Sequence, residues 1–354
     1  MISEKLRNNT MKREFGADFV RVAAVCLLFW LHFYLRNGFY NIPVNDAASF
    51  IANMFRPLFM TCVPLFAVLT GYLKCGKKWS ASYYRSLIPI VISWVLISGI
   101  HLLYKIFHLH QHLDAGEWIV QFLGFKLADY SWYVGMYVGL FLLSPLLNLA
   151  WDAVKTRKGH RAIVATFAVV SFIPATINGI GAICGIDQNL LPGYFTQVFY
   201  LGYYVIGCYI RTYRPRASRI ACAVLIVFIC AVHTLLNMFT RDVPNEFYTG
   251  YSASYSHPFI AILVVAVFLM LYDIECKKYP VRLMAYGISS VVLEMYLLSY
   301  LFDSNIYVLH RGEYGPASYS WVGLLMTLAV FVLSFVSGHI VHWISKTITK
   351  LFVK

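Results

Sequence analysis

The chain has 354 residues, of which 60% are hydrophobic and only 13% are charged. A soluble domain is about 45–50% apolar and about 25% charged, so this composition excludes an ordinary soluble protein and predicts a membrane protein. The formal net charge of +13 lies in small clusters between apolar runs. A nucleic-acid-binding protein would gather such charge on one patch, so we expect no nucleic-acid partner.

Ten apolar segments are candidates for transmembrane helices, each of which needs about 20 mostly apolar residues to cross the bilayer. They cover residues 17–36, 49–73, 87–107, 131–151, 162–183, 194–210, 218–239, 257–273, 284–302 and 317–343. The sixth and the eighth are short. The sequence therefore predicts an all-α bundle of about ten transmembrane helices, forming a single membrane domain over residues 1–354.

The orientation of the bundle follows from its lysines and arginines, which are enriched in cytoplasmic connections. With a cytoplasmic N-terminus, the cytoplasmic connections carry 22 of these residues, the outer connections carry 5, and 2 lie inside the apolar segments. Every alternate connection agrees with this assignment. We therefore expect both termini in the cytoplasm and the lipid bilayer as the surroundings of the chain.

The first segment contains RVAAVCLLFWLH, in which Arg21 and His32 enclose ten uncharged residues. Eleven helical residues are three turns plus about 20°, so the two side chains share one face, roughly 16 Å apart along the axis. Charged residues inside a membrane are costly and mark functional sites. The sequence predicts that this face lines a cavity; the alternative is that each side chain reaches its nearer membrane interface.

Two further charged residues lie inside apolar segments. Arg56 lies in the second segment, which contains two prolines, Pro57 and Pro64, and proline breaks are tolerated where neighbours or cavity water satisfy the freed carbonyls. Glu294, in SSVVLEMYLLSYLFD, is expected either to pair with an arginine or to be held by a serine or tyrosine.

The histidine cluster HLLYKIFHLHQH, at the end of the third segment, contains His101, His108, His110 and His112. We place it in the outer connection. No carboxylate or cysteine stands at ligand spacing, so we expect an interfacial loop and no metal site.

Five motifs in chain order resemble those of the membrane-bound acyltransferase family 3. Arg21-x10-His32 resembles the family's first-helix signature. The others are VPLFAVLTGYL, the basic entry KKWSASYYRSLIPIVISW with Arg85, SWYVGMYVGLFLLSPLLN and YLGYYVIGCYI. One departure concerns the ninth segment, where many members have histidine. Here Ser299 occupies that position, with Glu294 and Tyr296 retained, so the histidine's role in acceptor binding is not transferable.

The resemblance implies transfer of an acyl group, usually acetyl, from cytoplasmic acyl-CoA to a hydroxyl group of a surface polysaccharide or glycolipid. It implies a multi-pass enzyme of the bacterial inner (plasma) membrane. Arg21 and Arg85 would hold the donor, acetyl-CoA in the usual case. His32, with Arg21 in the same catalytic channel, would be the general base or a transient acyl carrier, because imidazole titrates near neutral pH.

The substrate-binding candidates are Arg56, Glu294, Tyr296 and Ser299, in the second and ninth segments. Arg56, chosen as a charge inside an apolar segment, is also the candidate for stabilising the developing oxyanion. Two other classes of protein remain open. A transporter or flippase of a glycan or lipid-linked intermediate would also have proline-broken helices and intramembrane charges, although no internal repeat is visible. A structural subunit of a glycan-assembly complex is the third class.

Overall fold

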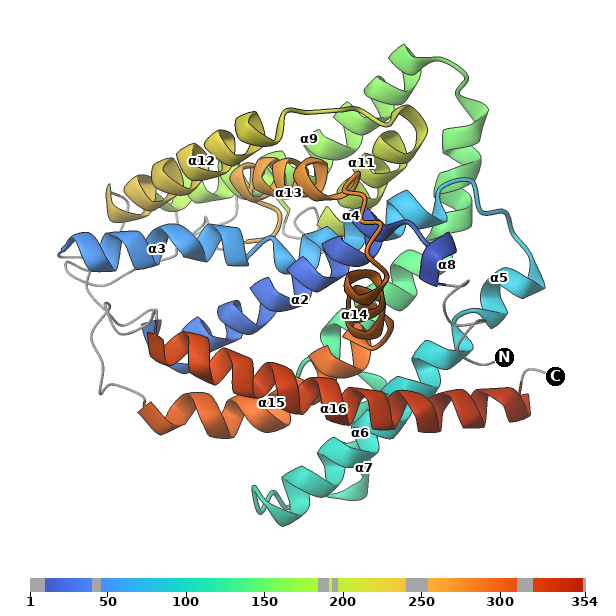
Figure 1. Ribbon diagram of the computed structural model, residues 1–354, viewed down its shortest axis with the longest axis vertical. Coiled ribbons are helices and arrows are strands. Elements are labelled where there is room, and N and C mark those ends of the chain that lie inside the picture. Colours follow the sequence, from blue (N-terminus) through green and yellow to red (C-terminus); the bar gives the residue numbers. More distant parts are fainter. Residues whose placement is uncertain are drawn as a thin grey trace.

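The computed structural model describes residues 10–39, 46–183, 191–192, 197–239, 254–310 and 321–352. Within these ranges the secondary structure is helical and contains no strand, which confirms the all-α prediction (Figure 1). In chain order the helices are α2 (Phe15–Arg36), α3 (Ala47–Phe59), α4 (Cys62–Lys74), α5 (Ala81–Arg85), α6 (Ile88–Phe107), α7 (Ala115–Leu123), α8 (Trp132–Ala153), α9 (Arg157–Ile183), α11 (Phe199–Tyr213), α12 (Arg219–Phe239), α13 (Pro258–Leu271), α14 (Tyr279–Ser290), α15 (Val292–Ile306) and α16 (Trp321–Phe352), with a short 3-10 turn, η3, at Tyr307–His310.

Seven stretches of helix in the described residues are long and apolar enough to cross a membrane, and the bent pair α14–α15 would be an eighth. Each of the ten predicted segments coincides with a helix or helix pair. However, the sixth and eighth correspond to α11 and α13, whose 15 and 14 residues are fewer than a crossing ordinarily requires. The ten-span count and the cytoplasmic termini therefore stay predictions.

Some of the sequence features that predict this topology lie outside the described residues. This applies to the predicted segment starts at 194 and 317 and to five charges of the orientation count, namely Lys5, Arg7, Arg241, Arg311 and Lys354.

Helix α2 occupies the centre of the bundle. It packs against α3, α4, α13, α14, α15 and α16. In Figure 1 it passes between the antiparallel pair α15–α16 and the helices α3, α4, α12 and α13. Its buried face is apolar over most of its length and includes Val20, Ala24 and Leu28. The helix that carries Arg21 and His32 is therefore surrounded by protein on several sides.

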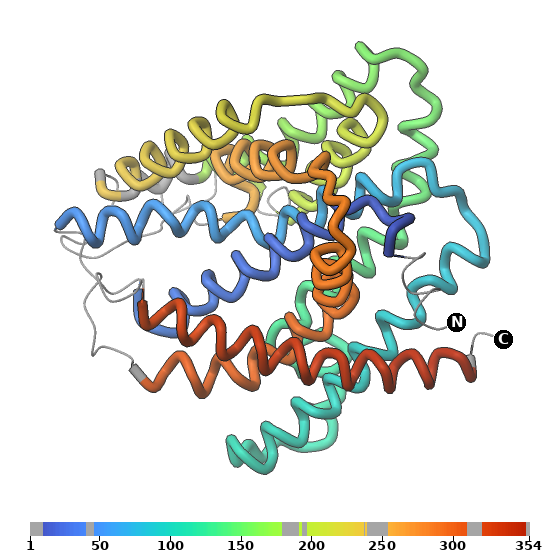
Figure 2. Tube along the Cα trace, in the orientation of Figure 1, coloured from blue at the N-terminus to red at the C-terminus, as the bar shows by residue number. Residues whose placement is uncertain are grey.

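The helices also define two sides of the molecule. Figures 1 and 2 show that α2 begins and α4 and α16 end on one side, whereas α2 ends and α3 and α16 begin on the other. Lys74, Lys77 and Lys350 belong to the first side, which we call the basic side. This arrangement agrees with the charge pattern, which predicts that α2 enters the membrane and α16 leaves it on the same face.

Helices α4 and α11 cross with their backbones in contact. A Cβ atom on Gly71 would lie 1.9 Å from the carbonyl oxygen of Tyr204, and one on Gly207 would lie 2.1 Å from that of Val68. Small residues at a crossing allow this close approach, which dispersion forces then stabilise. The glycines thus hold the predicted second and sixth segments together.

The predicted ninth segment is not one continuous helix. The chain bends by 66° between α14, which ends at Ser290, and α15, which begins at Val292. The Ser290 hydroxyl donates to the Gly287 carbonyl at 2.9 Å, so side chains replace part of the interrupted helical hydrogen bonding. Helix α15 also continues to Ile306, past the predicted end at residue 302, and so includes Asp303.

Candidate active site

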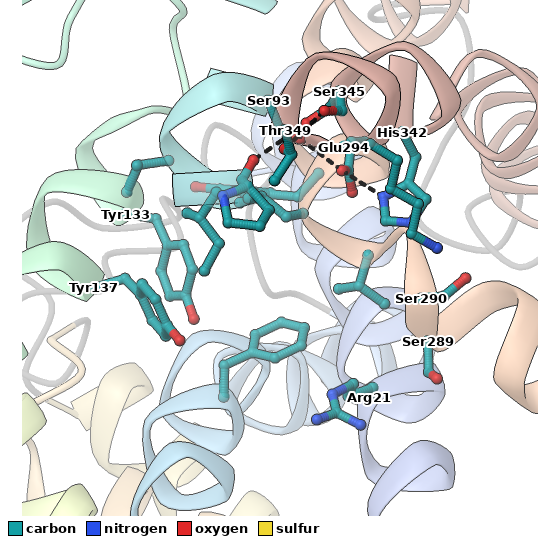
Figure 3. Close-up of a pocket in the computed structure, with 18 of the residues that line it drawn as sticks. Arg21, Ser93, Tyr133, Tyr137, Ser289, Ser290, Glu294, His342, Ser345 and Thr349 are labelled. Carbon is teal, nitrogen blue, oxygen red and sulfur yellow. Dashed lines mark hydrogen bonds and ion pairs between the residues drawn. The ribbon is translucent and has the colours of Figure 1, made fainter. Parts of the chain in front are cut away.

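A cavity of about 500 Å³ lies between α2, α6, α8, the α14–α15 bend and α16. Its walls are mainly apolar and aromatic. Polar residues also line it, and most of them are labelled in Figure 3. Besides three tyrosines, they are Arg21, Ser93, Ser289, Ser290, Glu294, His342, Ser345, Lys346, Thr349 and Lys350. A largely apolar pocket with a few convergent polar groups is the usual form of a ligand site.

Arg21 lines the cavity, as the sequence predicts for the α2 face, but its charge is already paired. Its Nη1 atom donates to Asp18 Oδ1 at 2.8 Å. Asp18 also accepts from Arg13 Nε at 2.9 Å and from the Ser289 hydroxyl at 2.9 Å. The Arg21 guanidinium is therefore anchored at the cavity wall by an acid one helical turn before it, with other N–H groups still available for a ligand.

Glu294 stands in the first turn of α15 and is buried. It accepts from the Ser93 hydroxyl at 2.8 Å, and His342 Nδ1 lies 2.9 Å from its carboxylate (Figure 3). Ser93 is also within 2.9 Å of the Ser345 hydroxyl. The prediction that Glu294 pairs with an arginine is wrong, and the prediction that a serine holds it is confirmed. His342 of α16 is an additional partner that the sequence did not predict.

Tyr296 separates the cavity from a second polar group deeper in the bundle. Its side chain lines the cavity together with Tyr133 and Tyr137. On its other side, its ring is stacked on Tyr130 at 5.6 Å and lies 6.2 Å from the His32 ring. His32 itself does not line the cavity. The face of α2 that carries both residues therefore runs from the cavity, which Arg21 lines, to His32, which contacts Tyr296.

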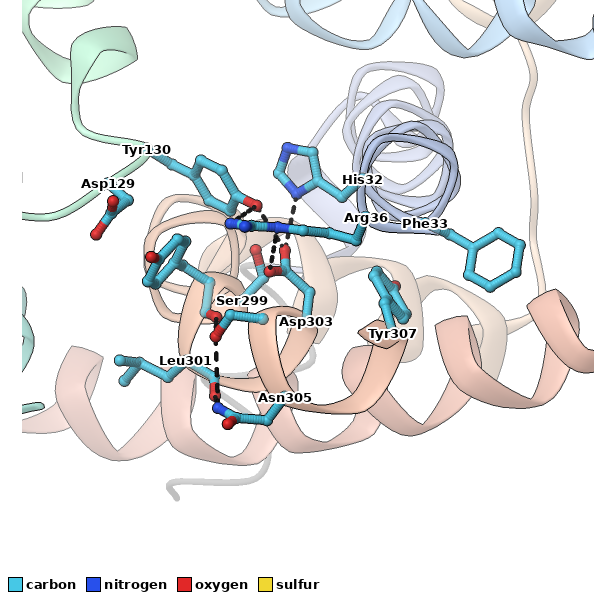
Figure 4. A network of polar contacts seen from close by, with 12 residues as sticks. His32, Phe33, Arg36, Asp129, Tyr130, Ser299, Leu301, Asp303, Asn305 and Tyr307 are labelled. Atoms are coloured by element: carbon cyan, nitrogen blue, oxygen red, sulfur yellow. Dashed lines mark hydrogen bonds and ion pairs between the residues drawn. The ribbon is translucent and has the colours of Figure 1, made fainter. Parts of the chain in front are cut away.

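The deeper group is centred on His32 and Asp303 (Figure 4). His32 Nδ1 lies 3.2 Å from Asp303 Oδ2, and the two side chains are 6% and 0% exposed, respectively. The other ring nitrogen, Nε2, points away from the carboxylate in Figure 4. Nδ1 lies beside the carboxylate without a hydrogen bond to it, so Asp303 acts on the ring through its negative charge. A nearby acid favours the protonated ring, which suits an Nε2 atom that takes up a proton.

Arg36 and Tyr130 complete the group. The Tyr130 hydroxyl donates to Asp303 Oδ2 at 2.8 Å, and Arg36 Nη2 donates to the Tyr130 oxygen at 3.3 Å. Arg36 Nε lies 3.5 Å from Asp303 Oδ1, and its guanidinium covers the Tyr300 ring at 4.8 Å. Arg36 is the last residue of α2. The Asp303 side chain therefore has Tyr130 as a hydrogen-bond donor and Arg36 as a nearby cation.

The remaining predicted site residues are not gathered here. Arg56 is buried in α3, where its Nη2 lies 4.0 Å from the Met60 sulfur. Arg85 is exposed at the end of α5. Neither residue lines the cavity. Ser299 is buried in α15, and its hydroxyl donates to the Tyr296 carbonyl at 2.8 Å. The roles predicted for these three residues stay predictions.

The placement of His101 in the outer connection is wrong. His101 lies within α6, fully buried, with Nε2 3.0 Å from the Leu297 carbonyl oxygen. Its Nδ1 is 3.7 Å from Asp129, which also lies 3.3 Å from Lys105 Nζ. Burial raises the pKa of the Asp129 carboxyl, but His101 and Lys105 outweigh it and bring that pKa below its ordinary value. No group of His, Cys, Asp or Glu able to hold a metal ion occurs in the described ranges.

Sequence reasoning missed Asp18, Tyr130 and Asp303, although the spacing of residues pointed to Asp18 and Asp303. Asp18 precedes Arg21 by three residues, a spacing that puts both on one helix face. Tyr296, Ser299 and Asp303 follow at intervals of three and four, so they form one stripe on α15. Ending the ninth segment at residue 302 hid the second signal.

Comparison with known proteins gives one family. A family model described as an acyltransferase domain matches residues 15–341. No curated protein and no solved structure matches the chain. The match covers every helix from α2 through most of α16. It includes the His32–Asp303 group and the cavity walls other than the end of α16, and it confirms the resemblance drawn from the five motifs.

Proposed function

The chain belongs to the acyltransferase 3 family, and from this membership we propose that it is an integral membrane O-acyltransferase of the bacterial plasma membrane. In this proposal it moves an acyl group, acetyl in the usual case, from acyl-CoA on the cytoplasmic side to a hydroxyl group of a surface polysaccharide or glycolipid. One observation carries the proposal: Tyr296 lines the cavity and also contacts the ring of a histidine held beside a buried carboxylate.

The cavity suits the donor. The pantetheine arm of acyl-CoA is long, thin and nearly neutral, whereas the nucleotide end is highly charged. An apolar and aromatic cavity with isolated polar groups would admit the arm and keep the nucleotide at the basic side. Arg21 and His32 are roughly 16 Å apart along α2, so an arm entering near Arg21 could bring its thioester toward His32.

The chemistry follows from the His32–Asp303 pair. His32 Nε2 takes the proton of the acceptor hydroxyl as its oxygen attacks the thioester carbonyl. The new C–O bond forms, the C–S bond breaks, and CoA leaves as a thiolate that recovers the proton from the imidazolium. Asp303 stabilises the imidazolium that forms in between, as a carboxylate does in hydrolase triads. Arg21 directs its remaining N–H groups to the donor.

Cells with and without the protein test the function. Mass spectrometry of their surface glycans should show acyl groups only where the protein is present, with the amount of glycan unchanged. Loss of the glycan itself, rather than of its acyl groups, would instead favour the exporter or flippase class. An unchanged glycan in both strains would count against this acceptor class.

His32→Gln gives the sharpest test of the mechanism. Glutamine keeps hydrogen bonding and similar size but cannot accept a proton at neutral pH, so turnover should fall by about 10²–10⁴-fold. The measurement is acyl transfer by purified protein in lipid nanodiscs, with calorimetric CoA binding as the control that the fold and donor site survive.

Release of CoA before acceptor is added separates the two roles of His32. An acyl carrier would release one equivalent in a burst, whereas a general base would release none. Near-normal turnover of His32→Gln would reject both roles.

A further inference from the structure

The C-terminal half of α16 presents a polar stripe to the cavity. Five of its residues line the cavity, at intervals of three, one, three and one, which puts them on a single helix face. They are His342, Ser345, Lys346, Thr349 and Lys350. The acyltransferase family match ends at residue 341, immediately before the stripe begins. This wall of the cavity is therefore a feature of this chain that the family match does not describe.

Among the residues that the structure describes, the two lysines are the cavity-lining cations without an acidic partner. Lys346 and Lys350 are exposed on the basic side, and no ion pair joins either of them to the part of the chain that the structure describes. Arg21, by contrast, is paired with Asp18 at 2.8 Å. Arg85 does not line the cavity. The uncompensated positive charge at the cavity is thus on α16, rather than on the arginines that the motifs suggest.

His342 adds a polar atom that lacks a partner. Its Nδ1 lies 2.9 Å from Glu294, which favours the tautomer with the proton on Nδ1. Its Nε2 is buried and has no hydrogen-bond partner among the described residues. A neutral imidazole in this tautomer presents Nε2 as an acceptor. Because that atom has almost no accessible surface, a ligand amide N–H would bond to it once the His342 ring turns toward the cavity.

We infer that Lys346 and Lys350 bind the phosphate groups of the acyl-CoA donor and that His342 accepts an amide N–H of its pantetheine arm. This inference rests on the proposed function. The lysines are one turn apart, about 6 Å along the axis, and Lys350 is about 12 Å from His342. The stripe thus meets first the phosphates and then the amides of an arm that enters toward Tyr296. Lysine suits the phosphates because it is a flexible point charge.

Calorimetric binding to the purified full-length protein tests the inference, with CoA and pantetheine as the probes. Lys346→Gln and Lys350→Gln should each weaken CoA binding by about tenfold, the size of one charge-assisted contact. Pantetheine binding should not change, because pantetheine has no phosphate. Lys158→Gln, an exposed lysine outside the cavity, is the matched control and should leave both affinities unchanged. Lys350→Arg should restore CoA binding because it keeps the charge.

Two results would overturn the inference. Wild-type CoA affinity in the double variant Lys346→Gln/Lys350→Gln would show that the phosphates bind elsewhere, and an Arg85→Gln variant measured alongside would locate them. Equal weakening of CoA and pantetheine would show that the lysines only maintain the shape of the cavity. If wild-type protein binds neither probe while remaining folded, the acyl-CoA donor of the proposed function fails instead.

Discussion

Asp303 is completely buried, yet three groups that donate or hold protons surround it: His32, Arg36 and Tyr130. A buried carboxylate costs several kcal/mol unless such partners compensate it. Removing the carboxylate outright would leave Arg36 and His32 without their acid, at a cost of about 3–5 kcal/mol. The informative change therefore keeps the shape and removes only the charge.

Asp303→Asn makes that change. The amide can no longer stabilise an imidazolium and can favour the wrong histidine tautomer, so turnover should fall by about 10²–10⁴-fold. The KM for the donor should change little, because Asp303 does not line the cavity. Steady-state kinetics with varied acyl-CoA measure both quantities. If turnover stays near normal in folded protein, Asp303 does not assist His32 in the proposed proton transfer.

Residue patterns in the sequence located part of this group. Arg21 and His32 were found because charged or titratable residues on one face of an apolar helix have few structural explanations. Asp303 was not, because an acid near the end of an apolar run looks like an interfacial residue. Only the three-dimensional pairing of α2 with α15 shows that His32, Arg36 and Asp303 meet.

The crossing of α4 and α11 is the tightest backbone contact described above and sets the positions of two predicted segments. Gly207→Ala would place a methyl group 2.1 Å from the Val68 carbonyl oxygen, so the helices must separate. We expect a loss of about 1–3 kcal/mol in stability. Thermal unfolding in detergent measures it.

Gly139→Ala is the matched control for that substitution. Gly139 lies within α8, and a Cβ atom there meets nothing within 4 Å. Alanine is the better helix former by about 1 kcal/mol, so this variant should be as stable as the wild type or more so. Equal melting temperatures for the Gly207 and Gly139 variants would show that the α4–α11 crossing is looser than the structure indicates.

The hydrophobic pattern predicted where the helices lie more reliably than how they are divided. All ten apolar segments contain helices, because length and hydropathy alone identify such segments. The 66° bend before Val292 was missed because serines, which satisfy the broken helix end, are also common inside membrane helices. The amphipathic helix α7 was missed because its nine residues are too few for a hydropathy window.

The molecule as a whole has its basic side where α2 begins and α16 ends (Figure 2). An even number of crossings would produce this arrangement, and the charge pattern predicts that this side is cytoplasmic. Terminal fusions to a reporter active only in the cytoplasm should therefore work at both ends. Fusions to a reporter active only outside should be silent. A C-terminal fusion active outside would contradict the arrangement and separate Lys350 from a cytoplasmic donor.

Helix α2 runs from Phe15 to Arg36 with no proline and no break. Arg21 and His32 are therefore fixed to one rigid rod, which can act as a molecular ruler for the donor. A thioester on a truncated arm, such as N-acetylcysteamine, is too short to lie near Tyr296 and reach the lysines of α16 at the same time. In the proposed mechanism the acyl group would pass through the protein at the end of the pantetheine arm, while the phosphates stay bound at the cytoplasmic end. Movement of the acyl group across the membrane and its transfer to the acceptor would then be a single directional process.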